Sequence, residues 1–221
     1  MKYKTATIIG HRGAAALAIE NSMPAFDRAF STELKWVETD LRVTADNVIV
    51  LNHDAFYKGK EISSLSFNEL NEISSGNLIS FCELLDKYSD KFNFDLDVKD
   101  SRVFQLIGKE LQRHSLGNQF LMSSFNHAEL AKFAILNPII QCAPIIASRP
   151  CSVEAFVNAT SFDFDKVIAD ANFCDSVMVS NFLKAGKQVW LYCIYSKEQA
   201  DHFIEMGISG IIVDNPNFFL Q

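Results

Sequence analysis

Residues 5–40 read TATIIGHRGAAALAIENSMPAFDRAFSTELKWVETD and set the pattern of the whole chain. The stretch opens and closes with a short apolar run, which is typical of a strand buried in a parallel sheet. Between the two runs, Ser22 can cap the start of a helix, and Pro24 suits an early helical position. Phe26 and Ala29 then lie on one apolar stripe of that helix. The stretch therefore predicts a strand, a helix and a second strand.

The same alternation of short apolar runs and helical patterns continues to the end of the chain. We expect strands over Thr5–Gly10, Trp36–Asp40, Val48–Leu51, Phe92–Val98, Gln119–Ser123, Ile139–Ala143, Val167–Ala169, Gln188–Cys193 and Gly210–Val213. We expect helices from Ser22 onward and over Ser66–Ile73, Ser80–Tyr88, Ser101–His114, His127–Leu136, Ser152–Asn158, Asn172–Lys184 and Lys197–Met206. The 221 residues thus hold about eight strand–helix units, which indicates an α/β protein that forms one (β/α)₈ TIM barrel over residues 1–221.

A doubly wound open sheet is the structural alternative to the barrel. No glycine-rich G-x-G-x-x-G follows the first expected strand, so the sequence does not indicate a dinucleotide site. There is also no linker-like tract rich in proline, glycine and serine, which favours one domain over two.

Composition limits the classes of partner. With 48% hydrophobic and 21% charged residues, the chain can bury a sizeable core. Its formal net charge is −7 and it has no run rich in lysine and arginine, which argues against nucleic acid as a partner. No apolar stretch reaches the ~18 residues of a membrane span, so we expect no stable membrane insertion. An anionic small-molecule substrate remains compatible with the negative net charge, because a bound divalent cation can invert the local electrostatic field.

The chain has five cysteines, an odd number, and no C-x-x-C pair. Zinc-ribbon and thioredoxin-like interpretations therefore have no support. Most of these cysteines have apolar neighbours, which favours buried free thiols in a reducing compartment, and we expect a cytoplasmic protein. The five are Cys82, Cys142, Cys151, Cys174 and Cys193.

The first expected strand ends in Gly10-His11-Arg12-Gly13. Basic side chains at the mouth of a strand can meet an anion or a substrate proton, while the glycines allow a tight turn. Taken alone, the tetrapeptide is explained at least as well by a turn that carries one exposed histidine.

The next two apolar runs also carry side chains that can bind a metal or transfer a proton. Glu38 and Asp40 are two residues apart on a strand, so they share one face. Inside a barrel they would repel each other unless a cation, a proton or a basic group compensated, and acidic oxygen sites suit Mg²⁺, Ca²⁺ or Mn²⁺. On an outward face they would form only a solvated edge. His53, followed by Asp54, ends the following run and can serve as a proton donor or acceptor, or simply occupy a turn.

The order and spacing of these motifs resemble the signature of the glycerophosphodiester phosphodiesterase family. The resemblance rests on His11-Arg12-Gly13, Glu20-Asn21-Ser22, Glu38-x-Asp40, His53-Asp54, Phe94–Lys99, Ser123-Ser124-Phe125, Trp190-Leu191-Tyr192 and Gly207–Pro216. It spans nearly the whole chain, and its N-terminal part is specific. It implies a (β/α)₈ barrel that hydrolyses glycerophosphodiesters to glycerol 3-phosphate and an alcohol.

The resemblance also implies roles for particular residues. One divalent cation (Mg²⁺ or Ca²⁺, with Mn²⁺ as an alternative) would bind to Glu38, Asp40 and Asp97. Arg12 and Lys99 would hold the phosphate, and Trp190 would line the substrate pocket. His11 and His53 would form the general acid/base pair, with His11 favoured as the base. Glu20 would orient this cluster or belong to the outer shell of the metal.

One residue departs from the family pattern, and two alternative functions remain open. Asp97 stands where the family has glutamate, so its metal contact is longer or runs through water unless Asp95 compensates. A lysophospholipase D would use the same site with an apolar acyl channel, which Phe56, Tyr57 and the many other phenylalanines do not exclude. A catalytically silent barrel that binds a phosphodiester or a protein is the alternative from another class.

The remaining polar candidates have plainer interpretations. His114, His127 and His202 lie in helical patterns without acidic partners, which favours surface or capping roles. Asp214, near the last expected strand, is interpreted as structural. The alcohol group, the physiological metal and the oligomeric state are not determined by the sequence.

Overall fold

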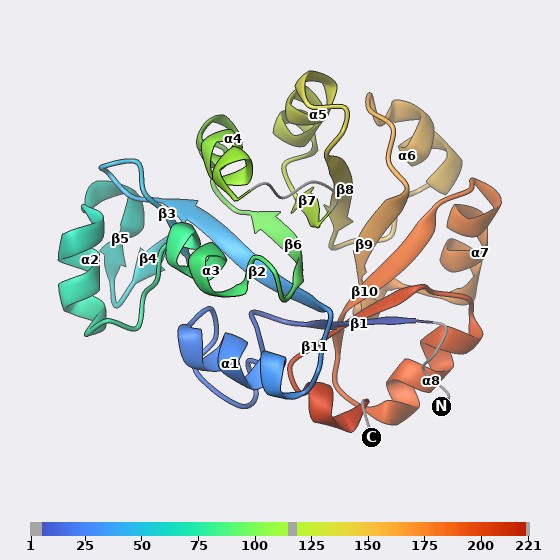
Figure 1. Cartoon of the computed structure of the whole chain (residues 1–221). Helices are drawn as coiled ribbons and strands as arrows, with labels where there is room; N and C mark the ends of the chain where they lie inside the picture. The colour runs from blue at the N-terminus through green and yellow to red at the C-terminus, as the bar shows by residue number, and fades with distance from the viewer. Residues whose placement is uncertain (1–5, 115–118, 220–221) are drawn as a thin grey trace.

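The computed structural model describes residues 6–114 and 119–219. Within them, eight parallel strands form a sheet in the order β1-β11-β10-β9-β8-β7-β6-β2, and a direct pairing of β1 with β2 closes it (Figure 1). The strands are β1 (Thr7–Gly10), β2 (Trp36–Val43), β6 (Asn93–Val98), β7 (Phe120–Ser124), β8 (Gln141–Ile146), β9 (Lys166–Asp170), β10 (Gln188–Ile194) and β11 (Gly210–Val213). The closing pair excludes the open doubly wound sheet and confirms the barrel.

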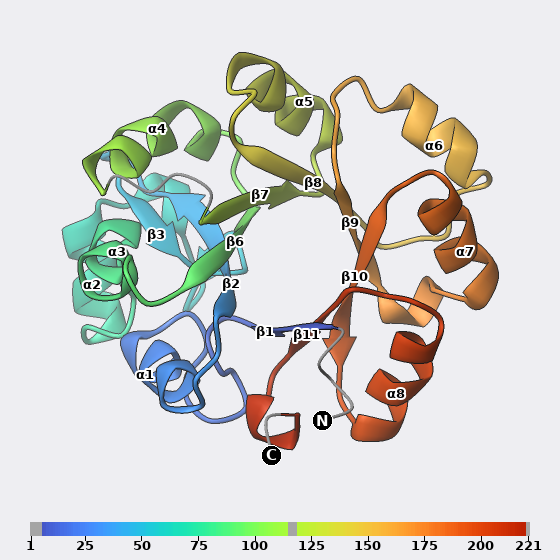
Figure 2. The same cartoon turned by 45° about the vertical axis from the view of Figure 1, so that its right-hand side comes forward.

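The helices ring the barrel strands (Figure 2). They are α1 (Met23–Ser31), α2 (Phe67–Ser74), α3 (Phe81–Tyr88), α4 (Val103–Arg113), α5 (His127–Leu136), α6 (Val153–Ala159), α7 (Ser176–Lys184) and α8 (Lys197–Glu205). Short 3₁₀ turns, η3 (Ala171–Phe173) and η4 (Pro216–Phe218), follow β9 and β11. In the described part of the chain, no helix is long and apolar enough to cross a membrane.

The connection from β2 to α3 carries an insertion beside the barrel. It contains β3 (Ile49–Leu51), which pairs with β2 in the antiparallel direction. It also contains a two-stranded hairpin, a 3₁₀ turn and α2. The hairpin strands are β4 (Phe56–Tyr57) and β5 (Lys60–Glu61), and the turn is η2 (Ile62–Ser64). A small apolar cluster of its own stabilises the insertion: Val50, Ile62, Leu70 and Leu78. The loop that follows β3 brings His53 to the barrel mouth.

Several predicted boundaries and caps differ from the structure. Ser22 occupies the N-cap position of α1, but its hydroxyl donates to the carbonyl of Ile19 and makes no cap bond. The strand expected over Ile139–Ala143 begins at Gln141 and runs on through Pro144, because Ile139 is 85% exposed in the preceding turn. The start of the strand expected at Thr5 lies outside the described residues.

The cysteine environment is also more open than expected. All five thiols are free, but only Cys142 is fully buried, and Cys151 is exposed. Apolar neighbours in the sequence therefore did not predict burial, because each of those neighbours faces its own side of a helix or strand. The reducing, cytoplasmic location inferred from these residues stays a prediction.

Two layers of apolar side chains place the site at one end of the barrel. The larger core lies between the strands and the helices and includes the fully buried Phe26, Phe81, Phe94 and Phe182. A smaller core fills the barrel interior with Ile9, Leu121, Ala143, Ile145, Ile168, Trp190 and Ile212. Because the interior is packed, a ligand has access only at a mouth of the barrel.

We expect Phe94→Ala to lower the free energy of unfolding by about 3–5 kcal/mol, as truncation of a fully buried aromatic ring usually does. The Phe94 side chain is 0% exposed, and its ring stacks on that of Phe120 with centroids 5.7 Å apart. Phe56→Ala is the matched control because Phe56 is 56% exposed. Urea denaturation of the two variants should separate them, and equal losses would contradict the packing described here.

Candidate active site

Four acidic side chains lie on the inner face of two neighbouring barrel strands. Glu38 and Asp40 are two residues apart on β2, so their side chains share that face. The parallel pairing of β2 with β6 sets Glu38 beside Asp95 and Asp40 beside Asp97. All four are buried, with exposed fractions of 6% or less. The pair on β2 therefore points into the barrel, and the register of β6 adds two more carboxylates.

Glu38, Asp40 and Asp97 form a set of oxygen donors that fits a divalent cation. One carboxylate oxygen from each lies within 4.8 Å of the others. Among the described residues, nothing donates a hydrogen bond to the buried Oδ1 of Asp97. Carboxylate oxygens are the ligands that Mg²⁺ and Ca²⁺ prefer in proteins. The trio thus offers the donor type, the spacing and a free ligand atom that a cation site needs.

Electrostatics of the same side chains also favour a cation. Burial, followed by the charge of Asp40, raises the pKa of Glu38 to about 8. Burial raises the pKa of Asp97 to about 6, although Lys99 opposes the shift. Burial likewise raises the pKa of Asp95 to about 7, against a hydrogen bond from Ser123. Buried carboxylates that resist ionisation are stabilised in their charged form by a nearby positive charge.

Two basic side chains supply part of that charge. Lys99 Nζ lies 2.5 Å from Asp97 Oδ2 and 3.3 Å from Asp40 Oδ1. Arg12 Nε lies 3.1 Å from Asp40 Oδ2, and Arg12 Nη1 lies 2.7 Å from Glu20 Oε1. Glu20 is therefore outside the carboxylate trio and positions the Arg12 guanidinium. Both cations border the cavity, where they can meet phosphate oxygens.

A tight turn after β1 presents His11 and Arg12. Arg12 has a φ of 50° and Gly13 a φ of 86°, and the Arg12 backbone N–H donates to Glu38 Oε2 at 2.9 Å. A Cβ on Gly13 would approach the backbone of Ala25 to 2.8 Å, so only glycine fits between the turn and α1. The glycine in His-Arg-Gly thus allows the backbone to carry two functional side chains in successive positions.

Residues from the other end of the chain hold His11. Its Nδ1 lies 2.5 Å from Asp214 Oδ1 and 3.5 Å from Cys193 Sγ. Its Nε2 lies 3.9 Å from Glu38 Oε2. Burial disfavours the charged imidazole, but the contacts with Asp214 and Cys193 and the charge of Glu38 outweigh burial and raise the pKa of His11 to about 11. These contacts therefore favour the charged imidazole over the neutral one.

The contact of Asp214 with His11 gives a specific partner to a residue that the sequence left as structural. β1 pairs with β11, with Gly10 opposite Val213, so the residues that follow these two strands are neighbours. In a closed barrel the first and last strands must meet, and this rule would have placed Asp214 beside His11.

His53 stands at the mouth of the cavity on the loop after β3. Its Nδ1 lies 2.8 Å from Asp54 Oδ1, and its side chain is 42% exposed. Its carbonyl accepts hydrogen bonds from Arg42 Nε and Nη2 at 2.8 and 2.6 Å. Sequence reasoning missed Arg42, although it continues the period-two series of Glu38 and Asp40 on β2.

Asn21 is a second positioning residue that sequence reasoning did not assign. It is 3% exposed, has a φ of 54°, and donates from Nδ2 to Asp40 Oδ2 at 2.9 Å. Its Oδ1 accepts from Thr39 Oγ1 at 2.7 Å. Asn21 therefore fixes the orientation of the Asp40 carboxylate from the segment that leads into α1.

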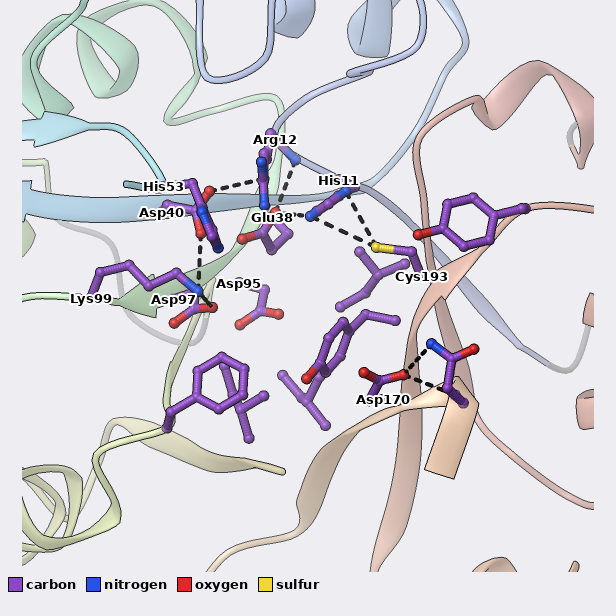
Figure 3. Close-up of a pocket in the computed structure, with 17 residues that line it drawn as sticks. His11, Arg12, Glu38, Asp40, His53, Asp95, Asp97, Lys99, Asp170 and Cys193 are labelled. Atoms are coloured by element: carbon purple, nitrogen blue, oxygen red, sulfur yellow. Dashed lines mark hydrogen bonds and ion pairs between the residues drawn. The ribbon is translucent and has the colours of Figure 1, made fainter. Parts of the chain in front are cut away.

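The four carboxylates, the two histidines and the two basic side chains share one cavity of about 200 Å³, lined on this side by His11, Arg12, Glu38, Asp40, His53, Asp95, Asp97 and Lys99. Figure 3 shows His11, Arg12, His53 and Lys99 gathered with the carboxylates, and Asp170 on the opposite side. The opposite wall consists of Phe125, Ile145, Ile168, Asp170, Asn172, Tyr192, Cys193, Tyr195 and Ile212. The cavity thus has a charged side suited to a phosphate and a more apolar side suited to the rest of a small ligand.

Trp190 does not meet the prediction that it lines this cavity. Its side chain is buried in the barrel interior, where its ring packs edge-on against Trp36 with centroids 5.2 Å apart. It lies over Gly210, where a Cβ would come within 2.5 Å of the indole. Tyr192, two residues further along β10, reaches the cavity instead. Both share one face of the strand, but they occupy different layers of the barrel.

Comparison with known proteins agrees with this fold. A glycerophosphodiester phosphodiesterase of Caldanaerobacter subterraneus subsp. tengcongensis is 21% identical to this chain, over 97% of this chain and 96% of the relative. The structure of an Oleispira antarctica phosphodiesterase in complex with the product sn-glycerol-3-phosphate matches with a TM-score of 0.86 and 21% identity, over 97% of this chain and 96% of that one. The glycerophosphodiester phosphodiesterase of Thermotoga maritima matches with a TM-score of 0.83 and 20% identity, over 97% of each chain.

The solved structures share the barrel fold of this chain, and the family assignment comes from the sequence. The model of the Glycerophosphoryl diester phosphodiesterase family matches residues 11–85 and 86–218, which include every motif of the predicted site. This chain therefore belongs to the glycerophosphoryl diester phosphodiesterase family.

Proposed function

We propose that this enzyme hydrolyses glycerophosphodiesters to glycerol 3-phosphate and an alcohol, with one divalent cation bound by Glu38, Asp40 and Asp97. The observation that carries the proposal is the convergence of this trio, two phosphate-binding cations and two histidines on one small cavity. The product named for the Oleispira phosphodiesterase, sn-glycerol-3-phosphate, belongs to the same chemical class.

Arg12 and Lys99 are the residues that would bind the phosphate. Each already pairs with a carboxylate of the trio, so a cation on that trio would release their N–H groups toward phosphate oxygens. The bound cation would itself neutralise charge on the phosphate and so lower the barrier to nucleophilic attack. Glu20 and Asn21 would keep Arg12 and Asp40 in place while the substrate binds.

The two histidines would move the protons. In our scheme His53 takes the proton of the glycerol hydroxyl next to the ester, and that hydroxyl attacks phosphorus. His11 gives its proton to the departing alkoxide oxygen, which leaves as the alcohol. The result is a cyclic phosphodiester. His11 then accepts a proton from the water that opens this ring, and His53 returns its proton to the glycerol oxygen, which restores both histidines.

This assignment of His11 as the acid reverses the preference drawn from the sequence. His11 Nδ1 donates a hydrogen bond to Asp214 and lies near Cys193 Sγ, whereas Nε2 faces Glu38. The contacts with Asp214 and Cys193 raise the pKa of His11 separately from the charge of Glu38. A charged imidazole is ready to donate a proton, whereas a base must first lose one.

The size of the cavity favours a small diester over a lysophospholipid. Its volume of about 200 Å³ suits a glycerol phosphate and a small alcohol but does not enclose an acyl chain. Phe56 is 56% exposed and does not belong to the cavity wall, which weakens the case for an acyl channel there. The intact histidine pair likewise argues against a barrel that only binds.

The direct test is release of glycerol 3-phosphate from glycerophosphocholine and glycerophosphoethanolamine. Turnover is expected with Mg²⁺, Ca²⁺ or Mn²⁺ and should stop when EDTA removes the metal. Absence of turnover with every metal across a broad panel of diesters would refute the proposal. Calorimetric binding of the diester without hydrolysis would favour the silent barrel.

Asp214→Asn is expected to move the alkaline limb of the pH–rate profile to lower pH. The carboxylate raises the pKa of His11 from its ordinary value of 6.5, so its loss should let that pKa fall. An acid must be protonated to act, so the variant should match the wild type more closely at acid pH and fall behind it as pH rises. Asp54→Asn is the control, because the Asp54 carboxylate pairs with the other histidine, His53. An alkaline limb that stays in place would contradict the role of Asp214.

A further inference from the structure

Two helices on the outside of the barrel bring together a second group of metal-binding side chains. Cys82 and Asp86 are four residues apart on α3, and Glu110 and His114 are four residues apart at the end of α4. Residues four apart on a helix lie on one face, so each helix offers a pair. The two helices are neighbours in the ring around the barrel (Figure 2). We call these residues the α3–α4 cluster: Cys82, Asp86, Glu110 and His114.

Distances within the cluster fit ligands around a shared ion better than direct hydrogen bonds. His114 Nε2 lies 3.7 Å from Asp86 Oδ1, and Cys82 Sγ lies 3.9 Å from Asp86 Oδ2. One ligand atom from each of these three residues lies within 4.8 Å of the others. Glu110 is close enough to hydrogen-bond with the Cys82 thiol. With zinc–ligand bonds of about 2.0–2.3 Å, tetrahedral ligand atoms stand roughly 3.3–3.7 Å apart.

Two buried polar atoms of the cluster are unsatisfied. The His114 side chain is only 10% exposed, and its Nε2 has no hydrogen-bond partner among the described residues. Within the same part of the chain, Glu110 Oε2 is also buried without one. Burying a polar atom without a partner costs about 1–3 kcal/mol, so such atoms call for an explanation. The interpretation of His114 as lacking acidic partners was therefore wrong, because the fold brings α3 beside it.

We propose that the α3–α4 cluster binds one zinc ion, separate from the cation of the active site. A thiolate and an imidazole are ligands that zinc prefers, and Asp86 adds a carboxylate to form a set of three protein ligands, which zinc accepts with water in the fourth position. Mg²⁺ and Ca²⁺ select oxygen donors instead, so the two sites differ in the metal that they take. The ion would tie α3 to α4 through side chains that leave the catalytic cavity untouched.

Arg113 must move for the ion to enter. Its Nη1 donates to Cys82 Sγ at 3.1 Å, which places a positive charge against the thiol. Arg113 is exposed, so its side chain can turn into solvent when a divalent cation supplies the positive charge beside Cys82 Sγ. The metal-free contact also provides a competing explanation for the cluster, namely a polar network between the helices, and the experiment must separate the two.

The test is titration of the metal-free full-length chain with Co²⁺ and Zn²⁺ in the presence of excess Mg²⁺. Co²⁺ bound to a thiolate gives a sulfur-to-cobalt charge-transfer band in the near ultraviolet, and tetrahedral ligands give intense visible bands. We expect one equivalent of such a site, with Zn²⁺ displacing Co²⁺. Cys82→Ser and His114→Ala should weaken binding about 100-fold or more, since loss of a residue that merely supports a ligand already costs about 10- to 100-fold.

Two other cysteines provide matched controls. Cys151→Ser removes an exposed thiol far from the cluster in the chain and should leave the band unchanged. Cys193→Ser removes the thiol that lies with His11 and Asp214 in the active site, the other group able to take a soft metal. No thiolate band, or a band that survives Cys82→Ser, would overturn the proposal. Because no readout is hydrolysis, failure here leaves the proposed function untouched, and the reverse also holds.

Discussion

His11→Ala is expected to slow the release of ethanolamine from glycerophosphoethanolamine by about 10²–10⁴-fold while largely sparing the release of p-nitrophenolate from the p-nitrophenyl ester of glycerol 3-phosphate. An alkoxide needs a proton in order to leave, whereas p-nitrophenolate is stable enough to depart without one. Because the contact with Asp214 favours the charged form of His11, we assign it the donation of that proton. The measurement is single-turnover release of the two leaving groups with the same bound metal, because the later opening of the cyclic diester would use His11 as a base with either substrate.

His53→Ala is the counterpart that makes this experiment decisive. If His53 activates the nucleophile, its loss should slow both substrates by a similar factor, because attack on phosphorus precedes departure of either leaving group. His202→Ala, on α8, should change neither rate. Equal losses on both substrates in His11→Ala would contradict its role as the acid. If His53→Ala instead spared the p-nitrophenyl ester and slowed only the other substrate, the roles of the two histidines would be exchanged.

Asp97→Asn is expected to reduce divalent-cation binding and hydrolysis together, by about 100-fold or more. The amide keeps the size of the side chain but loses the charge, and its nitrogen cannot act as a ligand. The buried Oδ1 of Asp97 accepts no hydrogen bond from the described residues, so the structure leaves it available to an ion. Mn²⁺ binding measured by electron paramagnetic resonance, alongside the rate, reports both quantities.

Two further variants separate a direct ligand from a neighbouring charge. Asp97→Glu restores the length that the family resemblance leads one to expect and should keep both metal binding and turnover. Asp95→Asn tests whether the adjacent carboxylate compensates for the short side chain. Asp95 already accepts a hydrogen bond from Ser123 at 2.6 Å, so we expect a smaller effect on metal affinity. Normal Mn²⁺ binding in Asp97→Asn would remove Asp97 from the ligand set.

Local patterns were enough to predict most elements. An apolar run bounded by turn residues located β11, and the alternation of strands with helical patterns located α5, at the bounds that the structure shows. Burial and backbone geometry act over a few residues, so a window of sequence contains them. Ends such as that of β2 were missed, because its last residues pair with β3 across a loop.

Local patterns likewise predicted some residues of the site and missed others. His11, Glu38 and Asp40 lie at or near the ends of consecutive strands, and their order was readable because a parallel barrel gathers strand ends at one mouth. Trp190 was placed in the cavity wrongly, since period-two alternation gives the face of a strand but not the depth along it. Asp214 was missed, since its partner lies 203 residues away.

The sequence by itself determined the barrel, the family and the chemical types at the strand ends, because these depend on local periodicity and on motifs that occupy a few residues each. Only the tertiary structure decided which side chains touch. The pairing of β2 with β6 aligned Asp40 with Asp97, and closure between β1 and β11 set Asp214 against His11. The packing of α3 beside α4 set Asp86 and Cys82 against His114. Each of these contacts joins residues distant in the chain, and only the folded barrel brings them within bonding distance.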